Sequence, residues 1–189
     1  MSAETPARVD EAPAQRVRER RWWPALVVTG LILALVAGGE SVRGEGAASQ
    51  EIAVGDARVR PPAGWTLDRS TPAAVELRRG PVVLTAQAAP SSYTGPAGLA
   101  TTYVQNVLRP TLADLAVDAP TPTTIGDGVP AARVPWVGVT DDGVTVEGLV
   151  VAAAGRRSSV IFVVAAPEGT LAAVVGDVAA MLDSTRFVV

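Results

Sequence analysis

The sequence predicts an α+β domain whose mainly antiparallel sheet is sandwiched between helices and is preceded by one N-terminal transmembrane helix. Three observations lead to this fold class. An uncharged apolar run of 18 residues lies near the start of the chain. The elements that follow it succeed one another as strands, helix, strands and helix. One of the later strand-like runs is apolar on both faces, as in a central strand that is covered on each side.

The apolar run extends from Trp22 to Gly39. As an α-helix it would be roughly 27 Å long, close to the hydrocarbon thickness of about 30 Å. Arg20 and Arg21 precede it directly, and Trp22 and Trp23 stand where an interfacial aromatic belt would lie. These four residues are therefore the expected flanks of an anchor in a lipid bilayer.

The charges around this run predict its orientation. The stretch RVRERR before it holds four Arg against one Glu, and an excess of Arg marks the cytoplasmic side. We therefore expect a single-pass protein of the cytoplasmic membrane with its N-terminus inside. Residues 1–21 are then a cytoplasmic segment, 22–39 the transmembrane helix, 40–50 a small polar tether and 51–189 an extracytoplasmic domain.

A cleaved signal peptide is the main alternative. The small residues AGG precede Glu40, so cleavage after Gly39 is permitted. The leading region is long and mixed in charge, and the apolar run exceeds a usual signal core, which favours a retained anchor. A buried globular helix fits poorly because the run is apolar on every face.

The first half of the outer domain carries strand and helix signals. Strands are expected around residues 52–59 and 65–67, and the segment AAVELRRGPVVLTAQA predicts a hairpin that turns at Arg79 and Gly80. A helix is predicted over residues 95–110 and ends at a proline. Its apolar side chains recur on one face at i, i+4 and i+8: Leu99, Tyr103 and Val107.

The second half begins with a loop that contains Pro120 and Pro122. Three strands are then predicted, AARVPWVGV, GVTVEGLVVAAA and SSVIFVVAA, separated by short turns. A final amphipathic helix is predicted in EGTLAAVVGDVAAMLDSTRF, with its start at Pro167 and Glu168. Its apolar face consists of Leu171, Val174, Val175, Val178, Met181 and Leu182.

Three stretches resemble the Mog1/PsbP-like domain family, which includes exported, membrane-anchored proteins of actinobacteria. PPAGWTL at residues 61–67 is similar to the family's P-x-G-W entry strand, and GDGVPAARVPW at 126–136 to its G-x-P-A strand start. MLDSTRF at 181–187 is similar to the S-x-x-F ending of its terminal helix. The resemblance covers about residues 51–189 and implies a single antiparallel sheet between helices. It implies no one activity and no catalytic residues.

The composition excludes much chemistry. All 16 basic residues are Arg, and the chain has no Lys, His or Cys. Disulfides, thiol nucleophiles and cysteine zinc sites are therefore excluded, and the commonest general base is missing. From Glu40 onward the chain holds 11 Arg and 15 acids, so that we expect no binding of nucleic acid. We also expect no cofactor and no enzymatic activity.

Two kinds of candidate site have simpler explanations. Asp141, Asp142 and Gly143 could offer oxygen ligands to Ca²⁺, but they lack the spacing of an EF-hand loop and are expected to form a hairpin tip. The serine pairs at 91–92 and 158–159 lack an activating base in a chain without His or Lys, and we expect them at loops or strand edges.

A possible partner surface remains. Trp65 and Trp136 are expected to be core rings, with a binding platform as the alternative. The two Arg pairs are placed at predicted hairpin tips, either solvated or in contact with anionic headgroups or an acidic partner. The candidate surface therefore comprises Trp65, Trp136, Arg78, Arg79, Arg156 and Arg157.

The first functional hypothesis is a membrane-anchored, non-enzymatic domain that binds a protein or a cell-envelope component outside the membrane, in export or assembly. The second is a secreted carrier of an apolar small molecule, released by cleavage after Gly39. An enzyme is the third, and it would need two carboxylates that converge in a cleft.

Overall fold

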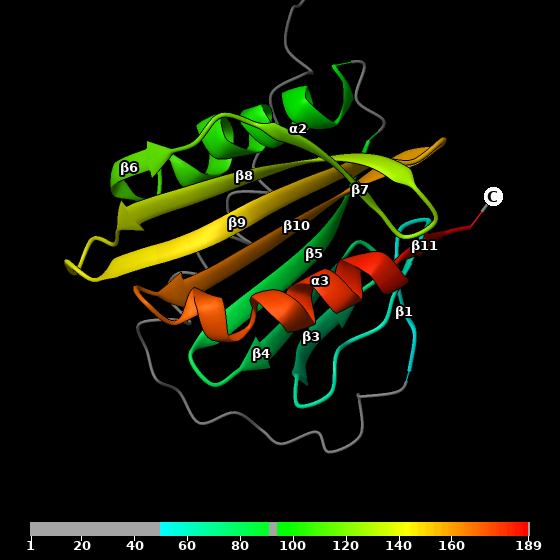
Figure 1. Ribbon diagram of the computed structural model, residues 1–189, viewed down its shortest axis with the longest axis horizontal. Helices are drawn as coiled ribbons and strands as arrows, with labels where there is room; N and C mark the ends of the chain where they lie inside the picture. Colours follow the sequence, from blue (N-terminus) through cyan, green and yellow to red (C-terminus); the bar gives the residue numbers. More distant parts are fainter. Residues whose placement is uncertain (1–49, 91–93, 189) are drawn as a thin grey trace, which may run out of the picture.

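The computed structural model describes residues 50–90 and 94–188, and these form two antiparallel sheets and four helical segments (Figure 1). The large sheet has eight strands in the order β3-β4-β5-β10-β9-β8-β6, and β7 also pairs with β8. Its strands are β3 (Thr66–Thr71), β4 (Ala74–Arg79), β5 (Val82–Pro90), β6 (Ala113–Val117), β7 (Thr121–Ile125), β8 (Val129–Val139), β9 (Thr145–Ala154) and β10 (Ser158–Pro167). The predicted α+β class with an antiparallel sheet is confirmed.

The helices cover both faces of this sheet, as predicted. One face packs against α2 (Gly95–Tyr103) and its continuation η2 (Val104–Leu108), which is a π-helix. The other face packs against α3 (Val175–Ser184) and the small sheet. In Figure 1 the two α-helices lie on either side of the strands.

The central strand β10 contributes to both cores, which confirms the prediction for its apolar run. Val160 and Phe162 belong to the core under α3, whereas Ile161 and Val163 belong to the core under α2. Consecutive side chains of a strand point to opposite faces, so an apolar residue at every position fills two layers.

The small sheet has three strands, β1 (Ile52–Val54), β2 (Ala57–Val59) and β11 (Arg186–Phe187), in the order β1-β2-β11. The strand expected around residues 52–59 is thus a hairpin. Its chain reverses at Gly55, whose φ of 58° lies in the left-handed region that glycine adopts without strain.

The prediction of a loop around Pro120 and Pro122 is wrong, because this part of the chain contains the edge strands β6 and β7. Both pair with the long strand β8, β7 along residues 129–133 and β6 along residues 136–139. Pro122 lies within β7. A proline lacks a backbone N–H but is tolerated on an edge strand, where one side of the ladder is open.

The final helix begins later than predicted. Glu168 and Gly169 form a turn, in which Gly169 has a φ of 79°, and a 3₁₀ turn η3 (Leu171–Ala173) precedes α3. The Leu171 N–H donates to the Glu147 carboxylate at 2.9 Å, which stabilises this turn outside the α-helix. Val175, expected on the apolar face, is 50% exposed as a result.

The predicted turns are confirmed. Gly80 and Gly143 have positive φ at the β4–β5 and β8–β9 connections. The helix predicted over residues 95–110 is present, with Tyr103 and Val107 buried.

The predictions for residues 1–21, 22–39 and 40–49 fall outside the described residues. Within the part that the structure describes, no helix is both long and apolar enough to cross a membrane.

Gly148 of β9 provides a test of the packing under α2. It pairs with Trp136 of β8, and an added Cβ would overlap the indole ring and the Val164 carbonyl oxygen. We expect Gly148→Ala to lower the free energy of unfolding by about 1–3 kcal/mol, as overpacking does in other cores.

Gly176 of α3 is the matched control, because a Cβ there meets no atom within 4 Å. Gly176→Ala is expected to leave stability unchanged or to raise it by up to about 1 kcal/mol. Urea unfolding of the full chain in detergent micelles, followed by circular dichroism, measures both variants. Equal effects of the two substitutions would contradict the packing described here.

Candidate functional site

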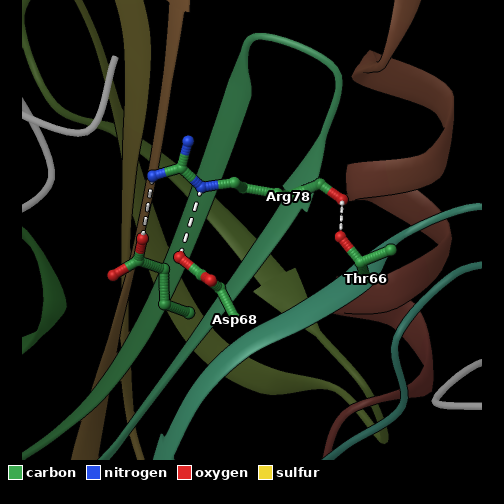
Figure 2. A network of polar contacts seen from close by, with 4 residues as sticks. Thr66, Asp68 and Arg78 are labelled. Carbon is green, nitrogen blue, oxygen red and sulfur yellow. Dashed lines mark hydrogen bonds and ion pairs between the residues drawn. The ribbon is translucent and has the colours of Figure 1, made fainter. Parts of the chain in front are cut away.

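Two regions gather polar side chains, and the first is a charge cluster on β3 and β4 (Figure 2). The guanidinium of Arg78 donates to Asp68 at 3.3 Å and to Glu76 at 3.5 Å. Thr66 donates its hydroxyl to the Arg78 carbonyl oxygen at 3.2 Å. Asp68 is the unpaired residue of a β-bulge, so that its side chain is free of the regular alternation of β3. The cluster therefore joins β3, the outermost strand of the sheet, to β4.

Glu76 is the least exposed carboxylate of this cluster, with a side chain only 10% exposed. Burial raises the pKa of Glu76 above its ordinary value, and the neighbouring charge of Asp68 raises it further, while Arg78 lowers it. Asp68 and Glu76 thus converge on one guanidinium that partly neutralises both. This arrangement is that of a structural ion cluster.

A second polar contact joins β4 to α3. Arg79 forms an ion pair with Asp177, and the indole N–H of Trp65 donates to the same carboxylate at 3.3 Å. Asp177 lies in the first turn of α3, where a negative charge is favourable. Arg79, expected at a solvated hairpin tip, is therefore bound to the helix that covers the sheet.

Trp65 and Trp136 lie in different cores. Each is 3% exposed, but Trp65 packs under α3 and Trp136 packs under α2. The indole nitrogen of Trp136 is buried without a hydrogen-bond partner. The two rings are core residues and form no common platform.

The second region is an open cavity of about 570 Å³ at the end of the domain away from the charge cluster. Arg78 pairs with Val83 of β5, which in turn pairs with Ala165 of β10. Ala165 lies seven residues, or roughly 23 Å, along β10 from Ser158, the strand end next to the cavity. We call this cavity the turn groove. Its walls are Asp56, residues 127–130, residues 154–157, Phe187 and Val188.

The turn groove has a mixed lining. Its charged residues are Asp56, Asp127, Arg156 and Arg157. Val129, Pro130, Ala154, Phe187 and Val188 supply apolar surface between them. Acidic and basic groups are thus present in equal number around an apolar wall.

Glycines allow the walls of the turn groove to approach closely. The Phe187 ring lies on Gly155, where an added Cβ would be 2.8 Å from the ring atom Cε1. Gly126 donates its N–H to the Leu182 carbonyl oxygen at 3.0 Å, and a Cβ there would overlap the Thr185 carbonyl oxygen. The C-terminal end of α3 therefore holds the β7–β8 turn in place.

The remaining candidates do not form a reactive site among the described residues. The hydroxyls of Ser158 and Ser159 are buried and have no hydrogen-bond partner, so no base contacts either one. At the β8–β9 tip, Asp142 accepts a hydrogen bond from Thr140. In the described ranges, no group of three or more His, Cys, Asp and Glu residues could hold a metal ion. Ser91 and Ser92 lie outside those ranges.

The structure thus divides the six predicted surface residues among three places. Arg156 and Arg157 line the turn groove, Trp65, Arg78 and Arg79 lie at the charge cluster or its junction with α3, and Trp136 lies under α2. Sequence reasoning missed the groove residues Asp56, Asp127, Phe187 and Val188. Gly-Asp occurs at 55–56 and at 126–127 and could have marked both chain reversals, although one strand was expected over residues 52–59. Neither signal indicates that the two turns lie close together.

Comparisons with known proteins place the fold. No family model and no curated protein matches the chain. Among solved structures, the cyanobacterial PsbP protein CyanoP from Synechocystis sp. PCC 6803 is similar with a TM-score of 0.54 and 15% identity, over 78% of this chain and 98% of that one. A mutant of the protein Mog1 is similar with a TM-score of 0.52 and 11% identity, over 74% and 95%.

A third structure is LpqN of Mycobacterium tuberculosis, described as involved in cell envelope biogenesis. It aligns with a TM-score of 0.44 and 11% identity, over 70% of this chain and 83% of that one. At this score the likeness supports no conclusion about the role of the chain. The likeness to PsbP and Mog1 shows that the described domain has a Mog1/PsbP-like fold, as the three sequence stretches predicted.

The raised pKa of Glu76 predicts a pH dependence of stability. Between the unfolded-state pKa and the higher folded-state pKa, the folded chain binds a proton more tightly than the unfolded chain. The contribution of Glu76 to stability is therefore fully present below the unfolded-state pKa and is lost as the pH rises through the folded-state pKa.

Glu76→Gln removes this titration. We expect the stability of the wild type relative to the Glu76→Gln variant to rise as the pH is lowered from 7 toward 4.5, the ordinary pKa. Urea unfolding at several pH values measures this difference. Glu168→Gln, at an exposed turn, controls for the removal of one carboxylate. If the difference in stability between wild type and Glu76→Gln stayed constant with pH, or changed in the opposite direction, burial would not be the dominant influence on the pKa of Glu76.

Proposed function

We propose that the chain is a single-pass protein of the cytoplasmic membrane with its N-terminus inside. Its Mog1/PsbP-like domain, residues 51–189, binds a protein or cell-envelope component outside the membrane, during export or assembly, without catalysing a reaction. We also propose that the chain belongs to the exported, membrane-anchored Mog1/PsbP-like proteins of actinobacteria.

The observation that carries the proposal is the uncharged run from Trp22 to Gly39 with the Arg-rich stretch before it. The first strand of the domain begins at Ile52, directly after the tether of residues 40–50. All described elements thus follow the proposed anchor, and the described residues by themselves form both sheets and both cores. An anchored chain presents the complete domain on one side of the membrane.

The chemistry of the described domain supports a binding role. Its converging carboxylates, Asp68 and Glu76, share the guanidinium of Arg78 and lie away from the turn groove. The serine hydroxyls at 158 and 159 contact no base. The turn groove offers charge and apolar surface on which another molecule can dock.

The alternative, a secreted carrier released after Gly39, has less support. An apolar ligand would need an apolar cavity between sheet and helix. The turn groove lies instead at the ends of strands, and it carries four charged residues.

Cysteine labelling tests the topology, because the natural chain contains no Cys. Ser70→Cys places a thiol on an exposed residue of β3, and Ser2→Cys places one in the proposed cytoplasmic segment. In intact cells, a membrane-impermeant maleimide is expected to label the chain with Ser70→Cys and not the chain with Ser2→Cys. After permeabilisation both are expected to react.

The same experiment separates the alternatives. A membrane-bound product of full length supports the anchor, whereas a soluble product that begins at Glu40 supports the secreted carrier. Labelling of Ser2→Cys but not Ser70→Cys in intact cells would reverse the topology and overturn the proposed function.

A further inference from the structure

We propose that the turn groove is the partner-binding site of the domain, and that it takes an extended polypeptide segment of another protein that carries both an acidic and a basic side chain. The segment pairs with the open edge of β11. This inference rests on the proposed function, since it assigns the binding role to one site and names the chemistry of the partner.

The charges of the groove select a segment of mixed charge. Arg156 is exposed and forms no ion pair within the described part of the chain, so it can receive a carboxylate. Asp56, between β1 and β2, and Asp127, between β7 and β8, likewise have no ion pair there and can receive a cation. A partner segment that carries both charges can pair with the Arg and the Asp residues of the groove, whereas a segment of one sign is repelled by the groove residues of the same sign.

The same arrangement disfavours an anionic membrane surface as the occupant. A bilayer of anionic lipids would be attracted by Arg156 and Arg157 but repelled by Asp56 and Asp127, which line the same cavity. The domain as a whole carries more acids than Arg, which adds to this repulsion. A protein segment is therefore favoured over the headgroup contact that the Arg pair alone suggested.

Among the described residues, the outer edge of β11 has no strand partner. Arg186 pairs with Arg58 and Phe187 with Ala57, and the Val188 N–H donates to the Asp56 carbonyl oxygen at 2.8 Å. In an antiparallel pair the hydrogen-bonded residues alternate, so Arg186 and Val188 point their backbone groups toward β2. The backbone N–H and C=O of Phe187 then point away from β2, and β11 is the outermost strand of the small sheet.

An extended segment can add to this edge as a further strand. In such complexes, main-chain hydrogen bonds supply affinity and pockets for alternate side chains supply specificity. The Phe187 ring and Val188, which is 52% exposed, give the segment apolar surface beside its backbone. The mixed charges on either side then set its register.

Site-specific photocrosslinking in living cells tests the site on the full chain. A benzophenone amino acid replaces Val188 in the groove or, as a matched control, Val175 on α3. The two valines are 52% and 50% exposed, so accessibility alone does not distinguish them. We expect a defined protein adduct from position 188 and at least about tenfold less of it from position 175.

The charge requirement is tested in the same assay. Arg156→Glu places a third acid in the groove, and we expect it to lower the adduct from position 188 about tenfold. Arg133→Glu, on an exposed position of β8 that does not line the groove, is the matched control and is expected to leave the adduct unchanged. Mass spectrometry of the adduct is expected to map the crosslink to a partner segment with both an acidic and a basic residue.

Each other outcome has a definite meaning. A protein adduct from position 175 but not from position 188 would leave the proposed binding role standing and overturn the turn groove as its site. If neither position 188 nor position 175 gave an adduct with a protein, the proposal that the domain binds a protein would be overturned. An adduct from position 188 with lipid, with a small molecule or with a second copy of the chain would overturn the proposed partner, as would equal yields from Arg156→Glu and Arg133→Glu.

Discussion

The rest of the structure depends on a sheet whose central strands are apolar on both faces. β10 is buried continuously from residue 159 to 166, and it lies between β5 and β9. Such a strand is stable in water only when both of its faces are covered. The chain supplies α2 and η2 for one face and α3 with the small sheet for the other. The charge cluster accordingly lies at one edge of the sheet and the turn groove at the strand ends.

The sequence predicted those elements whose signal is local. The two-sided apolar pattern of β10 and the turns at Gly80 and Gly143 are each encoded within a few residues, and they were predicted correctly, whereas the turn at Gly55 was missed. β6 and β7 were missed because Pro120 and Pro122 resemble loop residues, and only the pairing with β8 makes them edge strands. The start of α3 was missed because the carboxylate of Glu147, distant in sequence, holds the Leu171 N–H outside the helix.

The turn groove could not be predicted for the same reason. Asp56, Asp127, Arg156 and Phe187 come from four segments separated by about 30 to 70 residues, and each segment alone is an ordinary turn or strand end. Arg156 was singled out as a hairpin-tip cation, but its acidic neighbours are set by strand pairing across two sheets. Whether residues so distant in sequence lie close together depends on the register of strand pairing. A shift of one residue in this register would turn every side chain of a strand to the other face of the sheet.

The charge cluster and the turn groove are linked by one helix. At the first turn of α3, Asp177 binds Arg79 and Trp65, and at its C-terminal end the Leu182 carbonyl oxygen accepts the Gly126 N–H. A helix of ten residues is about 15 Å long and is rigid. When its first turn is fixed, its C-terminal end is fixed too, and with it the β7–β8 turn that starts at Gly126 and forms one wall of the groove. A wall held in this way loses little conformational entropy when a segment binds. The ion pair between Arg79 and Asp177, although remote from the groove, thus helps to fix the shape of the groove before the proposed partner binds.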